Sequence, residues 1–114
     1  MEAIRVVVRV KNISDISRYK ELSTEAIAKT EGEPGVLQYE WYLDEENGEC
    51  VILETYKDSD AVQAHLMNVG EILPQLIELG EMQVEVLGDI DEQLKALAEQ
   101  FGAKNIPYFN GIRL

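Results

Sequence analysis

The sequence predicts one mixed α+β domain, in which strands and helices alternate along a chain of 114 residues. Three observations support this fold class. Some segments show the two-residue apolar alternation of half-buried strands, other segments repeat apolar residues at helical spacing, and glycine, proline or capping residues separate them. A chain of this length can bury one hydrophobic core without disulfides or metal ions.

The first strand and the first helix are predicted near the N-terminus. Residues 4–11 alternate between isoleucine or valine at the even positions and mostly charged residues at the odd positions, which is the period of a strand. Ser14 or Asp15 can cap the helix that follows, and Gly32 and Pro34 end it. The apolar positions of this helix are Ile16, Tyr19, Leu22, Ala26 and Ile27.

A hairpin is predicted next, with strands at residues 36–43 and 50–56. The connection contains the Asn47-Gly48 pair, a strong turn signal between two runs of aromatic and branched residues. Alternation on the first strand places Leu37, Tyr39, Trp41 and Leu43 on one side and Val36 and Tyr42 on the other. We therefore expect bulky apolar groups on both faces of this part of the sheet.

A second helix begins after Asp58 or Ser59, either of which can cap it. Gly70 and Pro74 predict that this helix bends or breaks before residues 76–79. Its inward-facing apolar positions are Val62, Leu66, Val69 and Leu73.

The last regular elements are a fourth strand and a short third helix. Residues 82–88 again alternate between apolar and polar side chains and end at a glycine. Asp91 can cap the helix that follows, and Gly102 stops it. One face of this helix carries Leu94, Leu97, Ala98 and Phe101.

The order of the first six elements, β-α-β-β-α-β, predicts a ferredoxin-like fold with an antiparallel four-stranded sheet and two helices on one face. We assign residues 1–88 to this domain and residues 89–114 to a C-terminal helix and an apolar arm. The arm, residues 105–114, is almost uncharged. We expect it to pack on the same domain or on a dimer partner.

The expected open face of the sheet predicts a homodimer. Helices cover one face of such a sheet, whereas apolar side chains are predicted on both. A second copy related by twofold symmetry is the simplest cover for the other face.

Charge and composition limit the possible partners. The chain has 22 acidic and 10 basic residues and a formal net charge of −12, which repels phosphate backbones and anionic lipids. We therefore expect neither nucleic acid nor a membrane as a partner. There is no apolar run long enough to span a bilayer and no signal-peptide pattern, so we expect a cytoplasmic protein. Cys50, the single cysteine, is expected to fill space in a strand.

Five short segments of the sequence resemble a known family. They are Glu33-Pro34-Gly35, Tyr39-Glu40-Trp41-Tyr42, Leu53-Glu54-Thr55-Tyr56, Asp60-Ala61 and Ala64-His65-Leu66. With these segments, residues 1–88 resemble the antibiotic biosynthesis monooxygenase (ABM) domain family, whose members are dimeric α+β barrels. The family includes cofactor-independent oxygenases of aromatic polyketides, haem-degrading enzymes, isomerases of small metabolites and domains without known activity.

The resemblance implies a pocket between the sheet and the helices, with His65 as the candidate catalytic base. A neutral imidazole can take a proton from a phenol or hydroquinone near physiological pH. The electron-rich anion can then reduce dioxygen without flavin or metal. Tyr56, Trp41 and Tyr39 are the candidate substrate-binding residues, and Tyr56 stands where many family members carry a tryptophan. Each of these side chains has a structural alternative, namely packing in a hydrophobic core.

We therefore predict a homodimeric, cofactor-independent monooxygenase that acts on a small aromatic or quinol-like metabolite. A first alternative is a non-catalytic dimeric domain that binds a small hydrophobic molecule or serves in assembly. A second alternative is an isomerase of a small metabolite that uses the same pocket.

No cofactor is predicted. One histidine and one distant cysteine do not provide the ligands of a transition-metal site, and the glycines follow no phosphate-binding pattern. Residues 68–73 lack the histidine that the haem-degrading branch carries after the hairpin, and Asn12 lies just past the first strand. There is also no nucleophile elbow of a hydrolase.

The hairpin also carries two acidic residues, Glu40 and Glu54. We expect them to pair across the sheet with the basic residues Arg5, Arg9 or Lys57. A role as a general base would require that the carboxyl group be buried.

Overall fold

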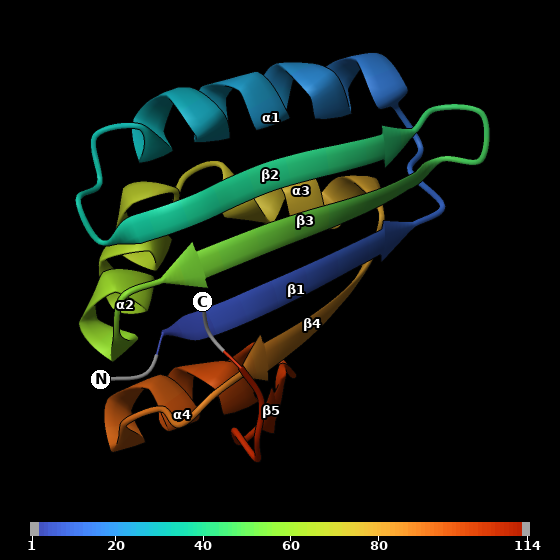
Figure 1. Ribbon diagram of the computed structural model, residues 1–114. Helices are drawn as coiled ribbons and strands as arrows, with labels where there is room; N and C mark the ends of the chain where they lie inside the picture. The colour runs from blue at the N-terminus through green and yellow to red at the C-terminus, as the bar shows by residue number, and fades with distance from the viewer. Residues whose placement is uncertain (1–2, 113–114) are drawn as a thin grey trace.

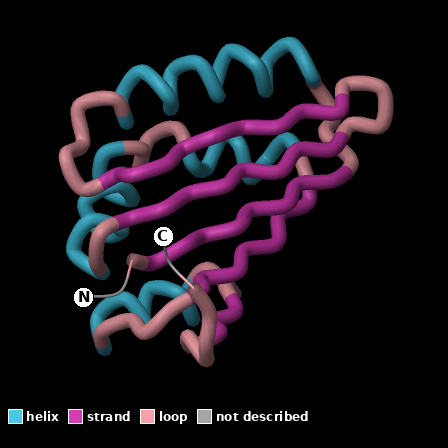
Figure 2. The backbone as a smooth tube through the Cα atoms, viewed as in Figure 1, coloured by secondary structure: helices cyan, strands magenta, loops and turns pink. Residues whose placement is uncertain are grey.

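The computed structural model describes residues 3–112, which form a five-stranded sheet with its helices on one side (Figures 1 and 2). The strand order is β2-β3-β1-β4-β5, and all pairs are antiparallel except the parallel pair of β4 and β5. The elements are β1 (Ile4–Lys11), α1 (Ile16–Thr30), β2 (Val36–Asp44), β3 (Glu49–Tyr56), α2 (Ser59–Asn68), α3 (Leu73–Leu79), β4 (Glu81–Leu87), α4 (Glu92–Gln100) and β5 (Lys104–Ile106).

The predicted ferredoxin-like order of strands and helices is confirmed, and aspartates begin three of the helices. The side chains of Asp15, Asp58 and Asp91 each accept a hydrogen bond from a backbone N–H in the first turn of the helix that follows. The predicted break after α2 separates it from α3, which has Pro74 in its first turn.

The predicted number of strands is wrong, because β5 extends the sheet beyond β4. Asn105 fixes this short strand by donating hydrogen bonds from its side chain to the backbone oxygens of Val86 and Gly88, at 2.9 and 3.0 Å. The backbone N–H of Gly88 donates to the oxygen of Ile106 at 2.8 Å. Three residues are too few to show a strand period, so this pairing has no clear sequence signal.

The predicted faces of β2 are wrong at its start. A register shift between Val36 and Gln38 places Leu37 on the outside, where its side chain is 62% exposed. Val36 instead packs against the core with Tyr39, Trp41 and Leu43. The physical reason is the β-bulge, because one extra residue inverts the alternation on its N-terminal side.

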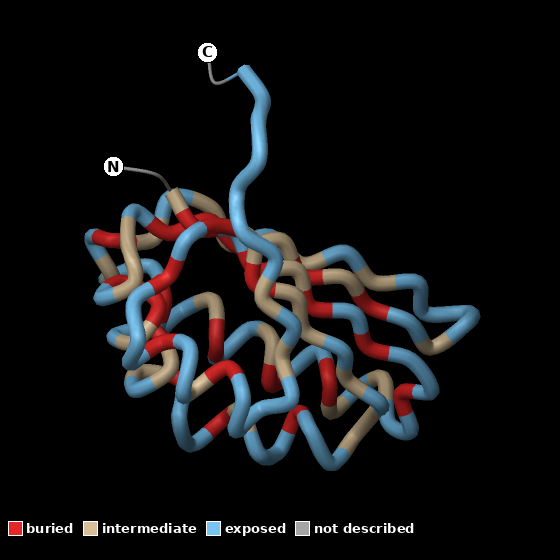
Figure 3. Tube along the Cα trace, turned by 90° about the horizontal axis from the view of Figure 1, so that it is seen from below, coloured by how far each residue is buried: buried red, intermediate tan, exposed pale blue. Residues whose placement is uncertain are grey.

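The core lies between the inner face of the sheet and the helices. The even-numbered residues of β1, from Ile4 to Val10, are buried there with Tyr19 and Leu22 of α1. The outer face carries the exposed Arg5 and Arg9 of β1, and it has no covering helix within residues 3–112 (Figure 3).

The arm projects away from the body of the molecule over residues 107–112 (Figure 3). Phe109 and Ile112 are 94% and 85% exposed in the single chain. Contact of this arm with a dimer partner stays a prediction, and its last two residues, 113 and 114, lie outside the described part of the chain.

None of the described helices is both long and apolar enough to span a membrane.

Candidate functional site

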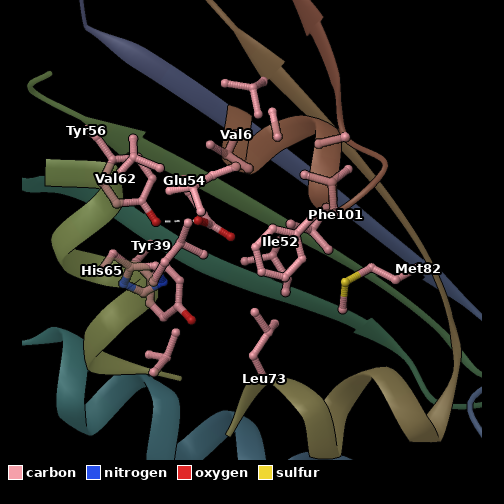
Figure 4. Close-up of a pocket in the computed structure, with 18 of the residues that line it drawn as sticks. Val6, Tyr39, Ile52, Glu54, Tyr56, Val62, His65, Leu73, Met82 and Phe101 are labelled. Carbon is pink, nitrogen blue, oxygen red and sulfur yellow. Dashed lines mark hydrogen bonds between the residues drawn. The ribbon is translucent and has the colours of Figure 1, made fainter. Parts of the chain in front are cut away.

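A mainly apolar pocket lies between the inner face of the sheet and helices α2, α3 and α4, and its cavity volume is about 100 Å³ (Figure 4). Aliphatic side chains from β1, β3, β4 and the helices form most of its wall. Five lining side chains carry a nitrogen or oxygen atom, namely those of Tyr39, Trp41, Glu54, Tyr56 and His65. The pocket thus has a mainly apolar wall that offers a few hydrogen-bonding groups.

His65 enters this pocket from α2 and is only 4% exposed. Its Nδ1 lies 3.1 Å from Oε2 of Glu33, which belongs to the turn before β2. Burial lowers the pKa of His65, and the Glu33 carboxylate opposes this shift. The imidazole is therefore neutral at physiological pH. We assign its proton to Nδ1, where it faces the carboxylate, so that Nε2 is a free acceptor.

Asn68 holds Glu33 in place at the end of α2. Its Nδ2 donates to Glu33 Oε2 at 2.7 Å and to the backbone oxygen of Lys29 at 2.9 Å. This side chain ties the end of α1 to the carboxylate that orients the imidazole. The position of His65 thus depends on Glu33, which Asn68 links to the end of α1.

Two tyrosines surround the imidazole. The ring centroid of Tyr39 lies 4.9 Å from that of His65, and the centroid of Tyr56 lies 5.5 Å away. Trp41 packs against Tyr39 in an edge-on arrangement at 5.8 Å. Burial, reinforced by the nearby Glu54 carboxyl group, raises the pKa of both Tyr39 and Tyr56, so both phenols stay protonated.

Glu54 is buried on the same wall of the pocket, with 8% of its surface exposed. It accepts a hydrogen bond from the Tyr56 hydroxyl, and the two groups point toward each other in Figure 4. Burial raises its pKa from the usual value of 4.5 to about 7, with the charge of Glu33 adding to the effect. The side chain is therefore poised between its acid and its anion at neutral pH.

The predicted pairing of Glu54 with a basic residue across the sheet is wrong. Glu54 points inward, as its neighbours Ile52 and Tyr56 do, whereas Arg5 and Arg9 are exposed on the other face. Among the salt bridges of the described chain, Glu54 pairs with none of Arg5, Arg9 and Lys57. The two-residue period from Cys50 to Tyr56 was a sequence signal for this inward orientation.

The structure brings all four predicted site residues, His65, Tyr56, Trp41 and Tyr39, to one pocket. No site role was expected from the sequence for Glu33 or Asn68, and for Glu54 only a pairing across the sheet was predicted. Glu33 and Asn68 lie 35 positions apart in the chain and meet only in the folded state. Within residues 3–112, no group of three or more His, Cys, Asp and Glu side chains is arranged to hold a metal ion.

The family model described as antibiotic biosynthesis monooxygenase matches residues 6–69, which is more than half of the 114-residue chain. The chain therefore belongs to the ABM family. No curated protein matches it.

Solved structures support the same fold. MupZ from Pseudomonas fluorescens is 19% identical with a TM-score of 0.86, and the match covers 100% of this chain and 96% of MupZ. Rv0793 from Mycobacterium tuberculosis is 27% identical with a TM-score of 0.68, covering 80% and 98% of the two chains. A mutant of SnoaB, a cofactor-independent oxygenase from Streptomyces nogalater, is 14% identical with a TM-score of 0.67, covering 80% and 96%.

Proposed function

We propose that this ABM-family chain is a homodimeric, cytoplasmic, cofactor-independent monooxygenase that oxidises a small neutral phenol or hydroquinone beside His65. The observation that carries this proposal is the buried imidazole, which is held at Nδ1 by Glu33 and borders an apolar pocket. The similar fold of SnoaB, a cofactor-independent oxygenase, supports the same reaction class.

His65 is the base of the first step. Because its pKa is lowered by burial, the imidazole is neutral and its Nε2 can take the proton of a phenolic hydroxyl. The imidazolium that forms is stabilised by the Glu33 carboxylate at Nδ1, in the way that a carboxylate supports histidine in a catalytic triad. Proton transfer thus needs no group from outside the chain.

The phenolate then reacts with dioxygen in the pocket. It donates electrons to dioxygen, and a C–O bond forms at a ring carbon that carries hydrogen. The resulting peroxide anion takes the proton back from the His65 imidazolium, which gives a hydroperoxide and restores the neutral base. Loss of water from this hydroperoxide gives the quinone, so that one phenol and one dioxygen yield one quinone and one water. Tyr39, Trp41 and Tyr56 supply the walls that orient the ring and keep out water.

The size and charge of the pocket define the class of substrate. A cavity of about 100 Å³ is smaller than the roughly 150 Å³ cavity known to bind benzene, so the substrate is small and the pocket wall must adjust slightly. No lysine or arginine is among the lining residues of the described chain, and Glu54 is acidic. We therefore infer a neutral single-ring substrate, and we expect ring carboxylates to be rejected.

A homodimer is part of this proposal. The outer face of the sheet carries Tyr42, which is 52% exposed, and partly buried Val7, Val51 and Leu53, and no described helix covers them. A second copy would bury this face. Sedimentation equilibrium at micromolar protein should give twice the 12.9 kDa chain mass, and a single-chain mass would contradict the dimer.

Oxygen uptake by chelator-treated protein tests the activity, with single-ring phenols and hydroquinones as substrates and protein-free solutions to correct for autoxidation. We expect uptake by the unmodified chain, strong loss in His65→Ala, and partial rescue of that variant by added imidazole. Met67→Ala is the matched control, because Met67 lies on the same helix and is 84% exposed.

The same experiment separates the alternatives. Uptake that His65→Ala leaves unchanged would show that the base is wrongly assigned. Thermal stabilisation by these phenols without any oxygen uptake would favour a binding domain. Hydrogen exchange into a ligand carbon without oxygen uptake would favour an isomerase.

A further inference from the structure

Glu54 is a buried titratable group that the proposed first step does not use. It borders the same pocket as His65 and has no basic partner among the described residues. A buried carboxyl group without a cation is costly to keep charged, and such groups are concentrated at functional sites. This carboxyl group is therefore expected to have a function in the pocket, and its hydrogen bonds indicate one.

The hydrogen bonds of Glu54 define which oxygen carries its proton. The Tyr56 hydroxyl donates to Oε1, so the proton of the neutral acid resides on Oε2. Oε2 has no hydrogen-bond partner within residues 3–112, and the side chain borders the cavity. The acidic proton is thus available to a ligand in the pocket.

Tyr56 places this acid close to the base. Its ring lies 5.5 Å from the ring of His65, while its hydroxyl bonds to Glu54. One aromatic side chain thus separates the two proton-transfer groups, and a ligand in the pocket can contact both. The titratable groups that interact with Glu54 are Tyr56 on its own strand, Tyr39 on β2 and Glu33 before β2. His65 on α2 contacts the ring of Tyr56.

We propose that Glu54 is the general acid that cleaves the O–O bond of the ligand hydroperoxide, with Tyr56 as its positioning residue. This inference rests on the proposed function. In this step the ring C–H proton passes to His65, and its electron pair forms the quinone carbonyl. The O–O bond breaks, and the departing hydroxide takes the Oε2 proton and leaves as water. After the quinone leaves, His65 releases its proton to water and Glu54 takes one up from water, so both residues are restored.

The raised pKa of Glu54, about 7, fits this role, because the acid is available at neutral pH. It also predicts a pH limit. Above about pH 7 the unmodified chain should form less quinone per oxygen consumed, because Glu54 has lost its proton. The hydrogen bond from Tyr56 lowers the pKa of Glu54, so Tyr56→Phe should move this limit to higher pH.

Product analysis of Glu54→Gln tests the proposal, with oxygen uptake, quinone and organic peroxide measured together on the dimer. Gln keeps the shape but cannot supply the acid, so we expect continued oxygen uptake with at least tenfold less quinone per oxygen and accumulation of peroxide. Glu54→Asp should recover part of the quinone yield. Glu49→Gln, an exposed carboxyl on the same strand, is the charge control and should behave as the unmodified chain.

The outcomes distinguish this proposal from the proposed function. If the unmodified chain and Glu54→Gln form quinone in the same yield per oxygen, the acid is wrongly assigned while the oxygenase stands. If the unmodified chain consumes no oxygen with any phenol, the oxygenase itself is refuted, and the acid with it. A pH limit that Tyr56→Phe does not move would refute the positioning role of Tyr56.

Discussion

Replacing Glu54 by glutamine should make the stability of the fold less dependent on pH. The pKa of Glu54 is raised by burial from 4.5 to about 7 in the folded state. Because the folded-state pKa lies above the unfolded value, the contribution of Glu54 to the free energy of unfolding is largest below pH 4.5. This contribution is lost as the pH rises through about 7.

The size of the effect follows from this shift. The difference of 2.5 pKa units between 4.5 and 7 corresponds to about 3 kcal/mol at 1.36 kcal/mol per unit. About two fifths of this is already lost at about pH 5.5, so about 2 kcal/mol remains to be measured between about pH 5.5 and about pH 9. This range avoids the sequence pI of about 4.4, where the protein is least soluble.

Urea unfolding monitored by Trp41 fluorescence measures this difference at each pH. The free energy of unfolding of Glu54→Gln minus that of the unmodified chain should increase by about 2 kcal/mol across the range. All other titrating groups are common to both proteins and cancel to first order. Glu49→Gln retains Glu54 and should keep the pH dependence of the unmodified chain. A difference that stays constant with pH would refute a raised pKa at Glu54.

Two further predictions concern the support of His65. In Glu33→Gln the pKa of His65 should fall further, because the carboxylate that opposes the effect of burial is gone. An NMR titration of this single histidine measures the pKa. An unchanged or higher pKa would contradict the assigned contact with Glu33. Gly35→Ala should cost about 1–3 kcal/mol of unfolding free energy in urea melts, because a Cβ there would lie 2.5 Å from the Cβ of Ala61. Combining it with Ala61→Gly should recover part of this loss. Gly32→Ala, which meets no atom within 4 Å, should cost little, and an equal loss in both variants would argue against the clash.

Much of the fold could be predicted from local patterns. The alternation in β1 and the aspartate caps before α1, α2 and α4 act within a few residues, so they are visible in the sequence. The bulge at Leu37 and the pairing of β5 depend on neighbouring strands, and no local pattern encodes them.

The site divides in the same way. His65 and the aromatic residues of the hairpin were found from residue type and family resemblance. The roles of Glu33 and Asn68 depend on the contact between the turn before β2 and the end of α2, which only the folded chain forms. Glu54 could have been placed inside from the two-residue period, but its raised pKa depends on the whole pocket, which removes water and provides no cation.

The most direct test of the monooxygenase is the fate of labelled dioxygen. The chelator-treated protein is given a single-ring phenol and ¹⁸O₂, and the quinone is reduced at once to the hydroquinone so that its oxygens do not exchange with water. The proposed reaction predicts one labelled oxygen atom in each product molecule and the other in water. Unlabelled product, or hydrogen peroxide as the only labelled species, would contradict the proposal that this pocket inserts oxygen into its substrate.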